Sequence, residues 1–264
     1  MQSNAGEIKQ SAARAYEFPL FGDLLGETFH PGGLKLTARL GEVAGINRSS
    51  RALDLACGKG AAICFFSQQY DCHVIGIDLS TLLVLSARSR VEDKKLSSKV
   101  DLLVGDGESL PFNDSAFDVV ISECSFSLLP NKEVAVAEIE RVLKPGGILA
   151  ITDVILRGKM SEEFRTQATF ASCIAGAESV DGYIEIFNQA GFKNPYVEDH
   201  SDEMKKVAYQ IMVDYGSFES FSAQIGEGSG ACRRECYTTA AGKIWQRLFK
   251  EAKPGYALIR VTKC

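Results

Sequence analysis

Acidic and glycine residues follow the first short apolar run of the chain at a spacing that suits nucleotide binding. Asp54 lies inside that run, Gly58 and Gly60 follow it, and Asp78 stands at the end of the next apolar run. Glycines that open a helix leave backbone N–H groups uncovered, because no Cβ blocks the approach of a ligand. A carboxylate at the tip of the following strand is placed to accept hydrogen bonds from a ribose diol. These residues therefore predict a nucleotide site.

Further carboxylates are expected at the same edge of the predicted sheet. The carboxyl ends of parallel strands meet at one edge, and ligands of open α/β sheets bind there. A ring of carboxylates repels the negative charges of a diphosphate and favours a nucleoside that bears a positive group. The residues expected at successive strand ends are Asp78, Asp106, Glu123 and Asp153.

The glycine spacing separates two classes of nucleotide. A dinucleotide fingerprint requires three glycines in the pattern GxGxxG, but Ile63 stands at the third position. Asp54 also lies where a pyrophosphate would be repelled, whereas it complements the α-ammonium and sulfonium groups of S-adenosylmethionine. We therefore predict S-adenosylmethionine as the cofactor, with S-adenosylhomocysteine as its product.

Alternating strand and helix patterns position these residues from Arg51 onward. Short apolar runs separated by helical segments are typical of an α/β fold with a parallel sheet and crossover helices. Helices are expected at residues 61–70, after Ser80 and at 131–143. Strands are expected at residues 52–56, 73–77, 100–104, 117–121, 148–152, 193–200 and 256–262.

Two helical regions flank this core. Residues 1–50 are predicted to form a helical arm, with helices at 12–16 and 33–45 and an aromatic stretch between them. We expect this arm to pack on the core or to form a lid. Between the last two strands, helices are expected at 201–215 and 239–252, with a flexible loop at 226–230. The predicted division is therefore an arm at 1–50, a core at 51–200, an insertion at 201–254 and the final strand at 255–264.

Composition excludes several classes of protein. The chain has 264 residues, 45% of them hydrophobic, which is enough for a sizeable globular core. A formal net charge of −5 and the lack of basic runs argue against nucleic acid as a partner. A polar N-terminus and the lack of long apolar windows predict a cytoplasmic protein without a membrane span or signal peptide. The sequence does not indicate an oligomeric state.

The eight cysteines are scattered along the chain, and the closest pair, Cys232 and Cys236, does not form a CxxC motif. Only three histidines accompany them. Because zinc sites use recognisable Cys and His spacings, we predict buried reduced thiols and no metal site.

Four motifs carry a resemblance to a known family. The segments LDLACGKG, VIGIDLS, VGDGESLPFNDSAFDVVISE and RVLKPGGILAITD resemble the class I S-adenosylmethionine-dependent methyltransferases of the large type 11 group. They span roughly residues 50–155 in the family's order. The resemblance implies a Rossmann-like, doubly wound sheet of seven strands that is mostly parallel, with the last strand antiparallel.

The resemblance also implies contacts with each part of the cofactor. The residues that it places along the methionine moiety are Asp54, Ala56, Gly58 and Gly60. Those that it places at the ribose and adenine are Asp78, Leu79, Asp106 and Gly107. Those that it places beneath the sulfonium are Glu123 and Cys124.

Two further resemblances concern the methyl acceptor. HPGGLKLTARL and ECSFSLLP are similar to segments of uncharacterised type 11 methyltransferases of anaerobes, which do not identify an acceptor. Residues 169–177, 181–187 and 190–192 resemble arsenite methyltransferases, in which a cysteine at the place of Cys173 is a ligand for trivalent arsenic. A second thiol would come from Cys232 or Cys236, while Cys64 lies one residue from the family's early cysteine, a rotation of about 100° on a helix.

Methyl transfer from a sulfonium is an in-line displacement that depends mainly on positioning and exclusion of water. We expect a small-molecule acceptor, covered by the helical insertion. A hydroxyl or carbon acceptor would need a base, for which Glu123, His30 and Asp153 are the candidates, whereas a thiol-bound metalloid would use the Cys173 thiolate. The alternative of another class is a protein that binds the cofactor without turnover, as a partner or regulatory subunit.

Overall fold

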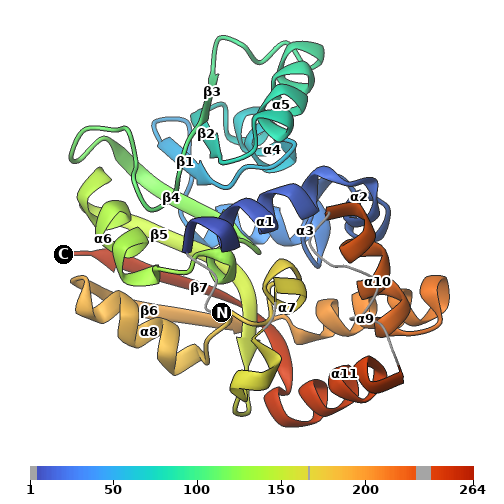
Figure 1. Cartoon of the computed structure of the whole chain (residues 1–264). Coiled ribbons are helices and arrows are strands. Elements are labelled where there is room, and N and C mark those ends of the chain that lie inside the picture. The colour runs from blue at the N-terminus through green and yellow to red at the C-terminus, as the bar shows by residue number, and fades with distance from the viewer. Residues whose placement is uncertain (1–4, 166, 230–238) are drawn as a thin grey trace.

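A seven-stranded sheet forms the centre of the protein (Figure 1), as seen in a computed structural model that describes residues 5–165, 167–229 and 239–264. The strand order is β3-β2-β1-β4-β5-β7-β6. β7 runs antiparallel to β5 and β6, and the pairs from β3 to β5 are parallel. The predicted fold class is confirmed. The strands are β1 (Arg51–Leu55), β2 (His73–Asp78), β3 (Val100–Val104), β4 (Phe117–Glu123), β5 (Leu143–Leu156), β6 (Phe192–Asp199) and β7 (Pro254–Lys263).

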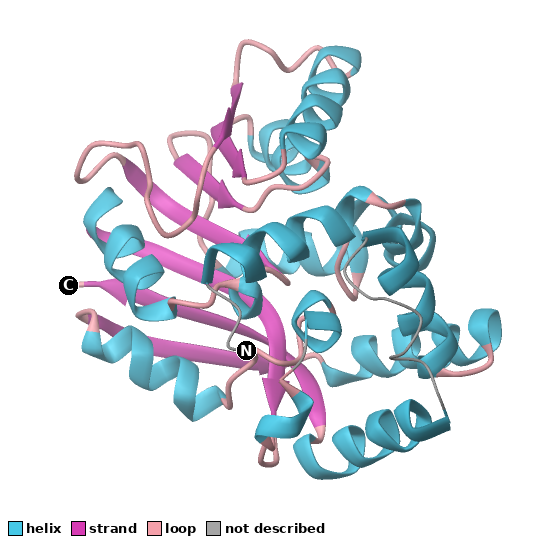
Figure 2. Ribbon diagram, in the orientation of Figure 1, coloured by secondary structure: helices cyan, strands magenta, loops and turns pink. Residues whose placement is uncertain are grey.

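Helices cover both faces of the sheet (Figure 2). Successive side chains of a strand point to opposite faces, and Ala52 and Leu53 of β1 accordingly belong to two different hydrophobic clusters. The first cluster includes side chains of α3 (Gly33–Val43), α4 (Ala61–Tyr70) and α5 (Thr81–Asp93). The second includes side chains of α6 (Lys132–Val142) and α8 (Val180–Gln189).

Local signals set the helix ends as the sequence predicts. The Ser80 hydroxyl accepts a hydrogen bond from the backbone N–H of Leu83 at 3.1 Å, which satisfies one of the free N–H groups at the start of α5. α6 ends at Val142, two residues before the Lys144-Pro145-Gly146-Gly147 segment. Proline cannot continue a helix, and the chain turns here into β5.

The remaining helices gather near the end of the sheet at which β5 terminates (Figure 1). α1 (Ala5–Glu17) contacts α2 (Pro19–Leu25), α7 (Gln167–Ala171) and α10 (Phe218–Ser229). α10 in turn contacts α9 (Ser201–Tyr215) and α11 (Thr239–Ala252). Short 3₁₀ helices occur at η1 (Gly26–Thr28), η2 (Phe126–Leu128) and η3 (Glu162–Phe164).

The predicted loop at residues 226–230 is wrong for residues 226–229, because α10 continues through them to Ser229; Gly230 lies outside the described residues. Each glycine costs a helix about 1 kcal/mol, so tertiary packing must offset the local preference. Phe221 of α10 is buried, with its ring centroid 6.2 Å from that of Phe21 and 5.2 Å from that of Tyr215. Packing of the Phe221 side of α10 against α2 and α9 therefore favours the helical conformation of α10.

Candidate active site

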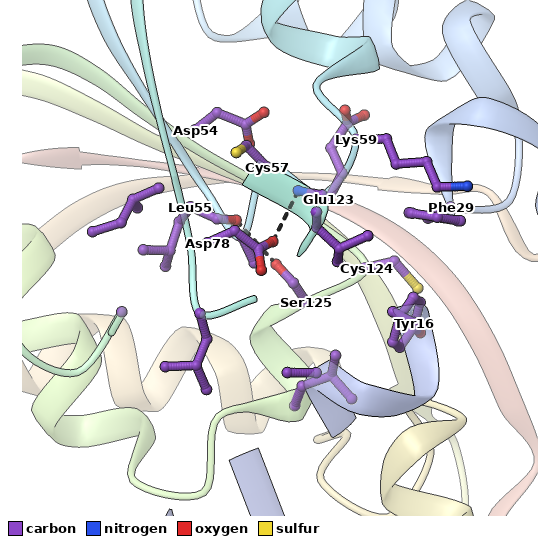
Figure 3. A pocket seen from close by; sticks show the side chains of 18 of the residues that line it. Tyr16, Phe29, Asp54, Leu55, Cys57, Lys59, Asp78, Glu123, Cys124 and Ser125 are labelled. Carbon is purple, nitrogen blue, oxygen red and sulfur yellow. Dashed lines mark hydrogen bonds between the residues drawn. The ribbon is translucent and has the colours of Figure 1, made fainter. Parts of the chain in front are cut away.

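The carboxyl ends of β1, β2 and β4 open into one cavity (Figure 3), and residues of α1 and η1 also line it. Its empty volume, open solvent included, is about 1030 Å³. Most of the residues predicted to bind the cofactor line it, although they come from separate strands and loops. They are Asp54, Ala56, Gly58, Asp78, Leu79, Asp106, Gly107, Glu123 and Cys124.

The glycine loop is held in a left-handed backbone conformation. Gly58 has a φ of +52°, and its N–H donates to Oδ2 of Asp78 at 2.9 Å. A Cβ at this position would lie 3.2 Å from the Phe29 ring. Gly60 does not contribute to the cavity lining. It has a φ of +75°, and an added Cβ would lie 2.9 Å from Cβ of Ala87, so its place in the fold is the close contact between α4 and α5.

Asp78 is fixed by hydrogen bonds to both carboxylate oxygens. Oδ2 accepts from Gly58, and Oδ1 accepts from the backbone N–H of Ser80 at 2.8 Å. Burial raises the pKa of Asp78, while the backbone hydrogen bonds oppose this shift. Each oxygen keeps a second lone pair, so the carboxylate can still accept hydrogen bonds from a ligand in the cavity.

Asp54 and Asp78 lack a basic partner among the described residues. Burial raises the pKa of Asp54 well above its usual value, and the nearby charges of Glu123 and Asp78 raise it further. Figure 3 shows the side chains of Asp54, Asp78 and Glu123 around one pocket. Each of these carboxyl groups therefore disfavours ionisation of its neighbours, and a cation bound among them would favour their charged forms.

The two basic side chains that line the cavity have other partners. Lys9 of α1 pairs with Asp106 at 2.5 Å and with Glu108 at 2.8 Å. Lys59 lies over the ring of Phe29, with Nζ 4.9 Å from the ring centroid. Both contacts join the N-terminal arm to the core. A cationic ligand would therefore meet Asp54 and Asp78 without a competing basic side chain from the described residues.

His30 and Thr37 contact the carboxylate of Glu123 and fix its position. The Thr37 hydroxyl lies 3.0 Å from Oε1 and 3.2 Å from Oε2 of Glu123, and Nε2 of His30 lies 3.2 Å from Oε1. Nδ1 of His30 lies 2.9 Å from the Pro31 carbonyl, which only accepts, so Nδ1 carries a proton. Burial is the largest single influence and lowers the pKa of His30, but the charge of Glu123 and the hydrogen bonds with Glu123 and the Pro31 carbonyl together raise it more, so the net shift is upward. His30 does not line the cavity.

Asp153, the third candidate base, lines neither this cavity nor the second one described below. Its oxygens accept from the backbone N–H groups of Ser127, at 2.9 Å, and Val154, at 2.6 Å. Burial raises the pKa of Asp153 to about 6. The geometry of Asp153 is that of a carboxylate that ties η2 to β5.

A second cavity adjoins the first, and its empty volume, open solvent included, is about 970 Å³. Tyr16 and Cys124 line both cavities. Cys173 lines the second, where its Sγ lies 3.1 Å from the Tyr16 hydroxyl and 3.1 Å from the Cys124 carbonyl. The hydrogen bond with the Cys173 thiol, together with burial, raises the pKa of Cys124 well above its usual value.

The sequence does not indicate that Tyr16 lines a cavity. The aromatic residues of the N-terminal arm indicate only that the arm packs on the core. The Tyr16 ring stacks on Phe21 with centroids 4.3 Å apart. Cys64 is buried in the core and lines neither cavity. Cys232 and Cys236 lie outside the described residues.

Within residues 5–165, 167–229 and 239–264, no group of three or more His, Cys, Asp or Glu side chains is placed to hold a metal ion. Every helix in these ranges is too short or too polar to span a lipid bilayer.

Several relatives are named as methyltransferases. The O-methyltransferase rstn1 of Aspergillus nomiae is 30% identical over 160 residues, which are 60% of this chain and 71% of the relative. Methyltransferase GfsG of Streptomyces halstedii is 26% identical over 238 residues, 88% and 80% of the two chains. Arsenite methyltransferase of Halobacterium salinarum is 34% identical over 145 residues, which are 53% of this chain and only 37% of the relative.

Solved structures share the fold. Phosphoethanolamine N-methyltransferase 2 of Haemonchus contortus, in complex with S-adenosyl-L-methionine, superposes with a TM-score of 0.71 at 22% identity, over 92% of this chain and 56% of that one. The [4+2]-cyclase SpnF superposes with a TM-score of 0.70 at 24% identity, over 97% and 96%. The family model described as "Methyltransferase domain" matches residues 53–151, the part that carries the glycine loop and the strand-end carboxylates. The chain belongs to the class I S-adenosylmethionine-dependent methyltransferases.

Proposed function

We propose that the carboxylate-lined cavity binds S-adenosylmethionine and that the second cavity holds a small-molecule acceptor. The observation that carries this proposal is the pair of buried carboxylates, Asp54 and Asp78, that line the first cavity without a basic partner among the described residues. Buried charges require compensation, and a cationic nucleoside supplies it. When bound, S-adenosylmethionine supplies a methyl group on a positively charged sulfur.

The residues of the first cavity suit the parts of this cofactor. Asp78, fixed by two backbone N–H groups, accepts from the ribose hydroxyls, and Leu79 packs beside the adenine. The adenine edge lies near Asp106 and Gly107. Oδ2 of Asp106 accepts from Lys9 and Oδ1 accepts from the Glu108 N–H, which leaves one lone pair on each oxygen for the base.

The methionine part of the cofactor lies between the glycine loop and the carboxylates of β1 and β4. Asp54 accepts from the α-ammonium group, Ala56 and Gly58 bring the backbone close, and Glu123 and Cys124 lie beneath the sulfonium. Gly60 supports the loop through the packing of α4 on α5 and makes no contact with the ligand. His30 is a positioning residue that acts through Glu123.

In-line transfer requires the acceptor atom beyond the methyl carbon, on the face opposite the sulfur and in line with the S–C bond that breaks, at a distance set by the protein. The junction of the two cavities, at Tyr16 and Cys124, provides this place. The arm at 1–50 and the insertion at 201–254 exclude water, which would otherwise compete with the acceptor. If the acceptor needs a base, Glu123 is the candidate that lines the first cavity, because His30 and Asp153 lie outside both.

This arrangement favours catalysis over a binding protein without turnover. A protein that only binds the cofactor has no need for a second cavity that opens onto the methyl donor, whereas a methyltransferase requires one. The contact of the two cavities at Tyr16 and Cys124 therefore supports an enzyme.

A thiol-bound metalloid is a second candidate acceptor, favoured by the adjacent Cys124 and Cys173 at the junction. We expect methylated arsenic from incubation with arsenite, glutathione and S-adenosylmethionine if this alternative holds. Cys173→Ser should then abolish the product, and an unchanged yield would reject Cys173 as a ligand.

The proposed cofactor site is tested by isothermal titration with S-adenosylmethionine, S-adenosylhomocysteine and NAD. We expect saturable binding of the first two and none of NAD. A preference for NAD, or no binding of either adenosyl ligand by the folded protein, would overturn the assignment.

A further inference from the structure

We infer that the methyl acceptor is an uncharged, predominantly apolar molecule, bound in the second cavity with its polar reactive end at Tyr16 and Cys173. This inference rests on the proposed function and adds the chemical class of the acceptor. Figure 1 shows α2, α9, α10 and α11, the helices that enclose this cavity, grouped beside the end of the sheet.

The walls of the second cavity are aromatic and aliphatic. Phe218 of α10 and Phe249 of α11 lie with ring centroids 4.6 Å apart, and Trp245 lies 6.0 Å from each of them. Phe221 and Ile211 are buried on the side formed by α10 and α9. Burying apolar ligand surface against such walls contributes about 25 cal/mol per Å², which favours an acceptor with a large apolar body.

The charges of the lining disfavour an ionic acceptor. Among the described residues, the lining contains no Asp or Glu that could pair with an ammonium group. Its two cations, Arg157 and Lys205, pair with Asp199 and Asp202, each at 2.7 Å. Moving a charged group into such a space without a partner is costly. Phosphate and ammonium groups, and therefore phosphoethanolamine, do not suit it.

A pair of uncharged polar side chains lies where the two cavities meet. The Tyr16 hydroxyl and the Cys173 thiol face one another at 3.1 Å, beside Cys124. Burial raises the pKa of Tyr16 well above its usual value, so the phenol stays neutral and can both donate and accept a hydrogen bond. A ligand with one polar end would orient that end toward the methyl donor and its apolar body toward α10 and α11.

The size of the cavity separates this acceptor from a metalloid. Two thiols are sufficient to hold arsenite, and the aromatic walls that extend to Trp245 would then have no ligand to contact. An organic acceptor with a polar end and an apolar body would fill both the polar junction and the aromatic part of the cavity.

Trp245, the only tryptophan of the chain, lines the second cavity and reports directly on its occupancy. We would measure its fluorescence in the full-length protein saturated with S-adenosylhomocysteine. The probes are geraniol and menthol as uncharged terpenoid alcohols, geranyl diphosphate as a charged form of the same chain, and phosphoethanolamine. We expect saturable emission changes with at least one alcohol, binding of geranyl diphosphate at least about tenfold weaker than geraniol, and none with phosphoethanolamine.

Variants on α9 test the location. Ala208→Phe and Met204→Phe place a ring in the second cavity and should weaken alcohol binding at least about tenfold through loss of space. Val213→Phe is the matched control, because Val213 is exposed on the same helix. Thermal unfolding of each variant shows whether it is folded.

The outcomes separate the inference from the function on which it rests. Failure of S-adenosylhomocysteine to bind in calorimetry would overturn the proposed cofactor site. Normal cofactor binding without an emission change from either alcohol would overturn only the apolar acceptor, as would tighter binding of phosphoethanolamine or geranyl diphosphate than of geraniol. Unchanged alcohol binding in both folded α9 filling variants would also reject it.

Discussion

Replacing Asp78 tests the proposed ribose contact with a magnitude that the structure supplies. Both carboxylate oxygens accept backbone N–H groups, from Gly58 and Ser80, and their remaining lone pairs are available to the cavity. In Asp78→Ala the two ribose hydroxyls lose their charged acceptor. Hydrogen bonds to charged groups contribute about 1.5–3 kcal/mol each, so binding should weaken by about 3–6 kcal/mol, roughly 10²- to 10⁴-fold in Kd.

The substitution Asp78→Asn separates charge from shape. The amide keeps one acceptor oxygen, so one of the two backbone N–H groups, that of Gly58 or that of Ser80, loses its partner. We expect a loss of affinity for S-adenosylhomocysteine smaller than that of Asp78→Ala but clearly measurable. The loss of that buried contact should also lower the free energy of unfolding by about 1–3 kcal/mol.

Isothermal titration with S-adenosylhomocysteine and urea denaturation provide the two measurements. Asp101→Asn is the matched control, since it removes one negative charge from a side chain that is 63% exposed. A Kd for folded Asp78→Ala within about threefold of the native value, less than 1 kcal/mol, would refute the assignment of the ribose to Asp78.

Three further substitutions test other parts of the site. The pKa of Asp54 is raised in the free protein, so a bound cation should lower this pKa and release a proton. Affinity for S-adenosylmethionine should therefore rise with pH. Calorimetric titration in buffers of different ionisation enthalpy should detect this proton release in the native protein and not in Asp54→Asn. His30→Ala should lower the free energy of unfolding by about 3 kcal/mol, because it leaves Glu123 buried without its cation. The pKa of His30 is raised in the folded protein, so this stabilisation is complete below pH 6.5 and is lost as the pH rises through the pKa of the folded state. Urea denaturation should therefore show a smaller effect of His30→Ala at pH 9 than at pH 6. The opposite trend would contradict the ion pair of His30 with Glu123. Gly60→Ala should lower the free energy of unfolding by about 1–3 kcal/mol, because residue 60 has a positive φ and an added Cβ would meet Ala87. The folded variant should keep the native Kd for S-adenosylhomocysteine. A large change in this Kd would place Gly60 in the ligand site.

Strand ends were predictable because their signals are local. Asp78 and Glu123 each follow an apolar run, and the parallel topology brings such ends to one edge. The helix starts at Ser80 and Ala61 also follow from local capping and glycine signals. These elements form within two residues of where the sequence predicts them.

Other features depend on contacts between distant segments. Gly226 and Gly228 favour a loop locally, yet α10, a helix that packs on α9 and α11, extends through both of them. His30 reads as a candidate base, but the fold places it behind Glu123 and out of the cavity. The sequence pattern did not separate Gly58 from Gly60, since only the approach of Ala87 distinguishes a ligand-facing glycine from a packing one.

Backbone strain around the cavities was also invisible in the sequence. Phe29, Ala56 and Cys124 line the first cavity, Cys173 lines the second, and each of the four has a positive φ between 53° and 60°. Residues other than glycine adopt this conformation at a cost of about 1–3 kcal/mol. It is retained where the surrounding structure imposes it, and such positions concentrate at functional sites.

By itself, the sequence determined the methyl donor and the sheet, because the motifs at residues 53–151 encode both through short-range spacing: a strand, a glycine turn, and acids at strand ends. Only the tertiary structure decided where an acceptor can bind. The second cavity is lined by side chains of α2, α9, α10 and α11, with Tyr16 of α1 and Cys173 at its polar end. These segments are separated by up to about 230 residues, from Tyr16 to Phe249, and no local spacing encodes a space that exists only once their apolar faces have packed together.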